Sequence, residues 1–158
     1  MQKELPVRKK IRLEGYDYSK NGAYFITICV KDKHEMLGRI VGAGSARPYC
    51  ELSDNGKIVE NAIITLCDKY ADITIDKYVI MSNHVHFVVV IGGRADPAPT
   101  VAQIIGHFKY QTTKEIDISG FWQRSYHDHI IRNESDYQRI WQYIDENPAK
   151  WAEDRYFV

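Results

Sequence analysis

The sequence has 158 residues, of which 44% are hydrophobic and 27% are charged. This length and composition predict one soluble, globular domain with a sizeable core, spanning residues 1–158, and exclude a disordered chain. Basic and acidic residues both number 21, so the formal net charge is zero and the chain as a whole lacks the basic surplus typical of nucleic-acid-binding proteins.

Targeting signals and disulfide bonds are not expected. No apolar run approaches the length of a membrane span, and the first ten residues lack the apolar centre of a signal peptide. Three cysteines, at positions 29, 50 and 67, are too few and too scattered for a disulfide framework or a CxxC metal site. We therefore expect a cytoplasmic protein with reduced thiols and no membrane partner.

The first twelve residues form a basic arm. Its charged residues are Lys3, Arg8, Lys9, Lys10 and Arg12, against the single acid Glu4. Such an arm can bind DNA phosphates without sequence preference. A solvated terminus without any ligand has the same composition, so charge alone leaves both interpretations open.

The first half of the chain predicts strands followed by a helix. Residues 22–30, GAYFITICV, are rich in aromatic and β-branched side chains and predict a strand, and a weaker strand is predicted over 36–42. Residues 52–70 predict an amphipathic helix, because apolar residues recur at every fourth position. Ser53 or Asp54 is its expected N-cap.

The second half alternates strands and helices. The predicted elements are a strand at 73–82, a strand at 83–91, a helix at 100–116, a strand at 121–132 and a helix at 135–148. Ser82 and Asn83 supply a tight turn, so the first two strands form a hairpin. Ser135 or Asp136 caps the last helix, and Pro148 ends it.

The predicted order is therefore β(β)αββαβα. Strands joined by short hairpins and covered by helices are typical of an α+β protein with a mainly antiparallel sheet. We predict a ferredoxin-like (RRM-like) sheet with packed helices and one added C-terminal helix.

Two histidines open the strand at 83–91. Alternate residues of a strand point to the same face, so the imidazoles of His84 and His86 lie side by side while Val85 faces the other way. Burying two adjacent imidazoles that bind nothing would place polar rings in a hydrophobic core without compensation. The pattern indicates a polar site on one face of the sheet and hydrophobic core on the other.

A rival pair, His127 and His129, has the same spacing in another predicted strand. The residue between them is Asp128, which a central strand would bury without an obvious partner. We therefore expect this strand at a sheet edge and prefer His84 and His86 as the metal pair. The alternative that both histidines are structural and bind no metal stays open, because two ligands alone make no metal site.

The last helix offers oxygen donors. Tyr143 and Asn147 are four residues apart and lie on one helical face. Imidazoles combined with oxygen donors suit a divalent cation such as manganese, with magnesium and zinc also compatible. Spacing alone favours a simpler interpretation, in which Tyr143 is one tyrosine among eleven and Asn147 is a helix cap.

Three blocks of sequence together resemble a known family. They are RLEGYDYSKNGAYFITICV, MSNHVHFVVV and FWQRSYHDHIIRNESDYQRIWQYIDENPAKW. Their combination and order resemble the REP-associated tyrosine transposases, relatives of the single-tyrosine transposases of the HUH class (His, hydrophobic, His). The resemblance runs from about Arg12 to Trp151 and implies a ferredoxin-like domain in which the added C-terminal helix is catalytic.

The resemblance implies a role for each matching residue. His84 and His86 would be metal ligands of a magnesium or manganese ion, Asn147 the third, amide-type ligand, and Tyr143 the nucleophile. Tyr126 and Tyr137 are the competing nucleophiles, although neither shares a helical face with Asn147. The expected DNA contacts are Arg124 and Arg132 of the third block and Arg8, Lys9, Lys10 and Arg12 of the basic arm.

The implied activity is DNA transposition by a metal-dependent, single-strand endonuclease and strand transferase. It would act on hairpin-forming repeat DNA through a covalent 5′-phosphotyrosine, as a monomer or as a homodimer that exchanges the tyrosine helix. Unpaired bases can stack on aromatic side chains such as Phe121, Trp122 and Tyr126. The alternative for these residues is ordinary core packing, which is the favoured interpretation for Phe121 or Trp122 taken singly. Two alternatives stay open: a hairpin-DNA-binding protein that no longer cuts, and a metal-dependent hydrolase that uses both histidines without a covalent intermediate.

Overall fold

The main strands form one antiparallel sheet in the order β4-β5-β1-β6. In the computed structural model, which describes residues 22–42, 47–92, 99–154 and 156, these strands are β1 (Gly22–Cys29), β4 (Ile73–Ile80), β5 (His84–Ile91) and β6 (His127–Ile131). β5 and β1 are therefore central and β6 lies at an edge. The connection between β4 and β5 is the predicted hairpin, closed by a bond from Met81 N–H to the His84 carbonyl.

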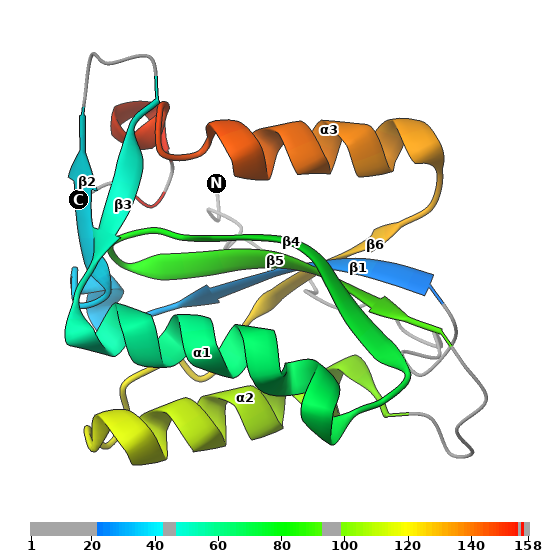
Figure 1. The fold of residues 1–158 in the computed structure, drawn as a ribbon, viewed down its shortest axis with the longest axis horizontal. Coiled ribbons are helices and arrows are strands. Elements are labelled where there is room, and N and C mark those ends of the chain that lie inside the picture. Colours follow the sequence, from blue (N-terminus) through cyan, green and yellow to red (C-terminus); the bar gives the residue numbers. More distant parts are fainter. Residues whose placement is uncertain (1–21, 43–46, 93–98, 155, 157–158) are drawn as a thin grey trace, which may run out of the picture.

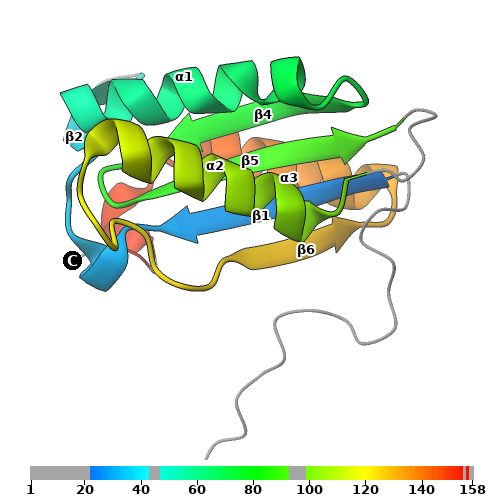
Figure 2. The same cartoon turned by 90° about the horizontal axis from the view of Figure 1, so that it is seen from below.

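Helices cover both faces of this sheet (Figure 1). On one face lie α1 (Asp54–Lys69) and α2 (Val101–Ile116), and on the other lies α3 (Glu134–Glu146). Figure 2 shows α1 and α2 side by side, with α3 behind the strands. The strands and the first two helices give the ferredoxin-like order βαββαβ, to which α3 is added, so the predicted fold class is confirmed.

Local sequence explains where the first two helices begin. The Ser53 hydroxyl accepts a hydrogen bond from the Gly56 N–H, so Ser53 rather than Asp54 caps α1. Thr100 and Gln103 form a reciprocal capping box at the start of α2. Each cap satisfies backbone donors that the first turn of a helix leaves unpaired.

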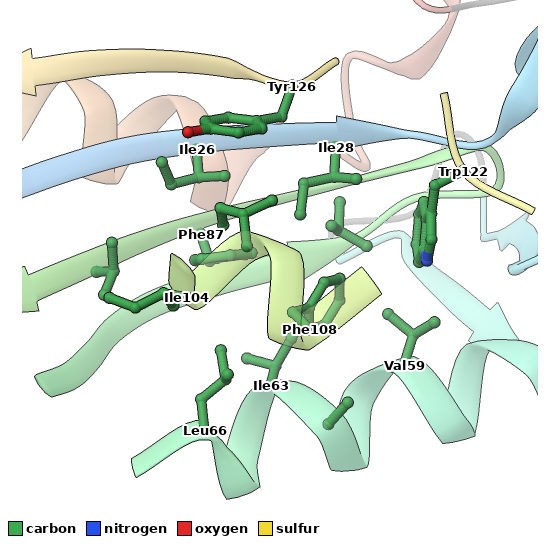
Figure 3. Packing of buried hydrophobic residues seen from close by; sticks show 14 of the residues in the cluster. Ile26, Ile28, Val59, Ile63, Leu66, Phe87, Ile104, Phe108, Trp122 and Tyr126 are labelled. Atoms are coloured by element: carbon green, nitrogen blue, oxygen red, sulfur yellow. The ribbon is translucent and has the colours of Figure 1, made fainter. Parts of the chain in front are cut away.

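The main core lies between the sheet and the pair α1 and α2 (Figure 3). Alternate residues of the central strands, including Ile26, Ile28, Val85 and Phe87, are fully buried there. Phe87 meets Phe108 of α2 with ring centroids 5.9 Å apart. Burying one such side chain contributes about 1.5–3 kcal/mol, so this face holds the fold together and leaves the opposite face free for other uses.

The opposite face carries a smaller apolar cluster beneath α3. Ile140 and Ile144 of the helix pack on Val88 of β5. This arrangement places the C-terminal half of α3 over the central strands and next to the histidines that open β5.

Three predictions about elements were wrong. A strand was missed: β3 (Tyr49–Leu52) pairs with β2 (Gly38–Val41) in a separate two-stranded sheet. The strand expected over 121–132 is reduced to β6, because Lys109 Nζ donates to the carbonyls of Gln123 and Ser125 and holds this segment as a loop. The cap of α3 is Asn133, whose side chain accepts from the Asp136 N–H at 2.8 Å, rather than Ser135 or Asp136.

Two short 3-10 helices complete the described elements, η1 (Lys31–Lys33) and η2 (Trp151–Glu153). The three cysteines form no disulfide bond within the described part of the chain. Within the described ranges, no helix has the length and apolar character needed to cross a membrane. The basic arm, with Arg8, Lys9, Lys10 and Arg12, lies outside the described residues.

Candidate metal centre and tyrosine helix

The two histidines of β5 are buried and meet at their tips. His84 is 0% and His86 1% exposed, and their Nε2 atoms lie 3.0 Å apart. The other nitrogen of each ring is held by an oxygen: His84 Nδ1 lies 2.8 Å from Asn83 Oδ1, and His86 Nδ1 lies 2.8 Å from Thr27 Oγ1. Oxygen partners on Nδ1 fix the ring orientation, as they do for histidines that bind metals through Nε2.

Burial also sets the charge of His84. Desolvation lowers the pKa of His84 to about 4, although the neighbouring Asp154 carboxylate and Asn147 side chain oppose the shift. His84 is therefore neutral at pH 7, and the neutral imidazole is the form that binds a cation.

Asp154 completes a set of three potential ligands. One ligand atom from each of His84, His86 and Asp154 lies within 4.8 Å of the others. Asp154 follows η2, some seventy residues after the histidines. Sequence reasoning missed it, because a single carboxylate beyond the last helix carries no distinctive spacing.

Asn147 directs an amide oxygen to the same place. Its Nδ2 donates to Asp154 Oδ2 at 3.0 Å. Its Oδ1 is buried and makes no hydrogen bond of ordinary geometry within the described part of the chain, yet it lies beside His84 closely enough to favour the charged ring. A buried oxygen without a partner costs free energy, which a bound cation would recover. Two imidazoles, an amide oxygen and a carboxylate together fit Mn²⁺ or Mg²⁺.

Tyr143 lies one turn before Asn147 on α3. Its side chain is 40% exposed, and its ring centroid is 5.3 Å from that of His86 and 6.0 Å from that of Phe25. It borders a hollow of about 270 Å³ shared with His86, and another of about 490 Å³ shared with Asn147 and Asp154. The phenol is thus accessible to a large substrate and adjacent to the histidines.

The competing tyrosines are placed differently. Tyr126 is 8% exposed and belongs to the main core between the sheet and the pair α1 and α2. The Tyr137 hydroxyl donates to Asp76 at 2.8 Å, and this bond raises the pKa of the phenol. Neither phenol lines the hollows that Tyr143 shares with His86, Asn147 and Asp154.

Contacts with the chain's own sheet hold α3 in place. Besides the bond from Tyr137 to Asp76, Lys77 Nζ lies 2.9 Å from Asp145 and 3.8 Å from the centroid of the Trp141 ring. These contacts join α3 to β4, so the histidines and Tyr143 meet within a single chain.

The segment after α3 covers the histidines. The Tyr156 ring lies 4.5 Å and the Trp151 ring 5.9 Å from the His84 ring, measured between centroids. The Tyr156 carbonyl accepts a hydrogen bond from Asn83 Nδ2 at 2.8 Å. The burial of His84 and His86 therefore depends in part on this C-terminal segment, which sequence reasoning did not assign to the site.

The rival pair lies on the predicted edge strand. His127 pairs in register with Thr27, which in turn pairs with His86, so the two histidine pairs share a sheet face with β1 between them. His129 is half exposed, and its Nε2 lies 2.7 Å from Asp136 Oδ2. Asp136 belongs to α3, so the contact between His129 and Asp136 joins the edge strand to the helix.

The remaining predicted contacts are dispersed. Arg124 borders a hollow of about 370 Å³ with Lys109 and Lys114 beside α2, and Arg132 is exposed between β6 and α3. The expected stacking platform is wrong: Phe121, Trp122 and Tyr126 are at most 8% exposed and belong to the core.

Comparisons with known proteins match nearly the whole chain. The family model described as IS200-like transposase matches residues 19–147. An uncharacterized protein of Haemophilus influenzae is 34% identical, with 96% of this chain and 93% of that protein covered. A second protein of the same organism, provisionally named a REP-associated tyrosine transposase, is 27% identical over 85% of this chain and 74% of its own length.

Two solved structures share the fold. A REP-associated tyrosine transposase bound to a REP hairpin superimposes with a TM-score of 0.68 at 21% identity, covering 91% of this chain and 76% of the other. A structure from Deinococcus radiodurans, provisionally described as a transposase, gives a TM-score of 0.51 at 15% identity, covering 85% and 95%.

Proposed function

The chain belongs to the family of IS200-like transposases, and its predicted resemblance to REP-associated tyrosine transposases is confirmed; on this basis we propose that it cuts and rejoins single-stranded DNA beside hairpin-forming repeats. Tyr143 is the nucleophile, and His84, His86 and Asn147 hold a divalent cation, with Asp154 next to them. The product of the first step is a 5′-phosphotyrosine.

One observation carries this proposal. A single turn of α3 brings Tyr143 and Asn147 together against the tips of His84 and His86, whose Nε2 atoms are 3.0 Å apart. The buried Asn147 Oδ1, which lacks an ordinary hydrogen bond within the described residues, supports a cation at this point. A purely structural histidine pair would not require a buried amide oxygen without a well-formed hydrogen bond beside it.

The cation, when bound, would withdraw charge from the phosphate and so favour attack by an oxygen nucleophile. Thr27 and Asn83 keep both imidazoles oriented. Asp154 keeps the Asn147 amide turned so that its nitrogen faces the carboxylate. These contacts organise the donors before any ligand arrives.

Tyr143 performs the covalent step. Its phenolic oxygen forms a bond to phosphorus while the bond from phosphorus to the 3′ oxygen breaks, and the phenol proton passes to water. The departing 3′ oxygen takes up a proton from water to become a hydroxyl, and the phosphotyrosine conserves the energy of the broken bond for rejoining. The exposure of Tyr143 allows a DNA strand to reach it.

The choice of substrate is supported by the relative that was solved with a REP hairpin. The basic arm, Arg124 and Arg132 stay predicted DNA contacts. The contacts that join α3 to β4 support a site that is complete in one subunit.

Covalent trapping tests the proposal. The protein is incubated with Mn²⁺ and a pool of hairpin oligonucleotides whose single-stranded flanks are randomised, and the products are separated on a denaturing gel. We expect a protein–DNA adduct, which sequencing of the trapped DNA converts into a target site. The adduct should disappear in Tyr143→Phe and persist in the matched variant Tyr137→Phe.

The other outcomes identify the alternatives. Hairpin binding without an adduct would indicate a protein that no longer cuts. Metal-dependent cleavage without an adduct, unaffected by Tyr143→Phe, would indicate a hydrolase.

A further inference from the structure

The second histidine pair lines a groove beside the tyrosine. The hollow of about 270 Å³ that contains His86 and His127 and a neighbouring hollow of about 400 Å³ have Phe25, His129 and Tyr143 in common. The two hollows therefore adjoin and form one groove between β6 and α3. We define this β6–α3 groove by Phe25, His127, His129, Arg139 and Tyr143.

A polar bridge crosses the outer end of the groove. Asp136 accepts hydrogen bonds from His129 and from the Arg139 guanidinium, with one carboxylate oxygen for each. The bond from Arg139, with help from His129, lowers the pKa of Asp136. The carboxylate is thus held by two hydrogen-bonding partners, and its side chain is 13% exposed while that of Arg139 is 73% exposed.

The outer hollow, next to this bridge, is favourable to anions, whereas the inner hollow also has Asp128 in its lining. The outer hollow is lined by Phe25, His129, Arg139, Ile140 and Tyr143, and none of these described residues is acidic. A guanidinium carries five N–H donors, so Arg139 can contact Asp136 and still bind a phosphate. Asp136 also restricts the arginine to the side of α3 that faces the groove.

Rings supply the remaining surface. Phe25 stacks on His86 with centroids 5.2 Å apart and meets Tyr143 edge to face. Phe25 is also the register partner of His129, so aromatic and imidazole rings run from the metal pair to the sheet edge. Such surfaces bind unpaired bases by stacking.

We propose that the β6–α3 groove binds the single DNA strand that leads to Tyr143, with Arg139 as a phosphate contact and Phe25, His127 and His129 as the surface for the adjoining nucleotide. This inference rests on the proposed function, because it takes Tyr143 as the point of attack. It assigns the second histidine pair to substrate rather than to metal.

Arg39 provides a matched control for Arg139. Both arginines are about equally exposed, at 76% and 73%, and both pair with an acid, but Arg39 pairs with Glu51 on the β2–β3 hairpin. The test measures binding of a fluorescent oligodeoxythymidine strand by anisotropy, in the Tyr143→Phe background, with a chelator present and at several salt concentrations. Neither cleavage nor the metal then contributes to the signal.

We expect Arg139→Gln to weaken binding about tenfold and to reduce the salt dependence by about 0.7 in the slope of log K against log salt, the value for one lost phosphate contact on a single strand. Arg39→Gln should change neither quantity. Equal affinities and equal slopes for Arg139→Gln and its parent would overturn the proposal.

A second pair of variants tests the histidines. The double variant His127→Asn, His129→Asn should bind the same strand more weakly and should titrate Mn²⁺ in calorimetry as the wild type does, with His34→Asn as the control. Loss of Mn²⁺ binding in the double variant would assign this pair to metal and overturn the proposal. Thermal unfolding of every variant checks that the fold is retained.

The two proposals fail separately. An Arg139 effect on strand binding without any covalent adduct in the wild type would contradict the transposase mechanism and support the groove. An adduct in the wild type without an Arg139 effect would support the transposase mechanism and contradict the groove.

Discussion

The two histidine pairs have the same spacing and lie on the same face of one sheet, but their surroundings differ. His84 and His86 belong to a central strand, are at most 1% exposed and have their Nδ1 atoms held by side-chain oxygens. His127 and His129 belong to the edge strand and are exposed, and His129 faces a carboxylate. The position of the strand in the sheet therefore decides what an HxH pair can do.

The physical reason is desolvation. A central position removes water from both imidazoles, and for His84 this desolvation lowers the pKa so that the ring is neutral at pH 7, the form that can bind a cation. An edge position leaves imidazoles in contact with solvent, where they can bind an incoming anionic strand. The same short motif thus supports two roles, and the sequence distance between the pairs is irrelevant because β1 brings β5 and β6 together.

The largest expected effect separates the pairs by their metal dependence. His84→Ala and His86→Ala should each abolish Mn²⁺ binding and slow adduct formation more than about a thousandfold, because the cation is expected to supply several kcal/mol of charge stabilisation. His127→Ala should retain Mn²⁺ binding. Calorimetry and single-turnover adduct formation measure both quantities, and a comparable loss of metal binding in His127→Ala would remove the distinction.

The next effect concerns stability. Saturating Mn²⁺ at about a hundred times its Kd should stabilise the wild type by about 2.7 kcal/mol, which corresponds to a rise in Tm of about 5–10 °C for a chain of this size. His84→Ala should show no rise, whereas His129→Asn should show the same rise as the wild type. Differential scanning fluorimetry with and without a chelator measures the shift.

A smaller effect tests how Asp154 supports the central pair. Asp154→Ala removes the partner of the Asn147 amide and one potential ligand, so the affinity for Mn²⁺ should fall about 10- to 100-fold. The neighbouring Glu153→Gln is the control, because Glu153 is exposed and does not belong to the cluster. An unchanged affinity in Asp154→Ala would show that the two histidines and Asn147 suffice.

The sequence correctly predicted how His84 and His86 lie on the sheet, but it did not predict the C-terminal segment that covers them. Alternation in a strand is a local property, so His84, Val85 and His86 could be assigned to opposite faces of the sheet from their spacing alone. The one-turn relation between Tyr143 and Asn147 is local as well. Asp154 and Tyr156 reach the site through the path of the chain after α3, and no periodicity records where that path leads.

The same contrast between local patterns and long-range contacts explains the errors in the elements predicted from the sequence. β3 has four residues and pairs with β2 alone, so it offers too little pattern to be recognised. The strand expected over 121–132 combines aromatic residues that pack in the core with the true edge strand. Phe121 and Trp122 look like a strand or a stacking platform in sequence, whereas their burial is fixed by contacts with α2, such as the bond from Trp122 Nε1 to Thr112 Oγ1 at 2.8 Å.

The smallest expected effect sharpens the comparison at the edge strand. The contact between His129 and Asp136 is half exposed on the histidine side, so breaking it with His129→Asn should lower the free energy of unfolding by no more than about 1 kcal/mol. Most of the attachment of α3 comes instead from its apolar face and from Tyr137 and Lys77. Urea denaturation at low and high salt measures the difference, which salt should reduce further by screening. A loss of several kcal/mol would mean that the edge pair is a structural element of the helix docking, and the groove would then have to be tested through Arg139 alone.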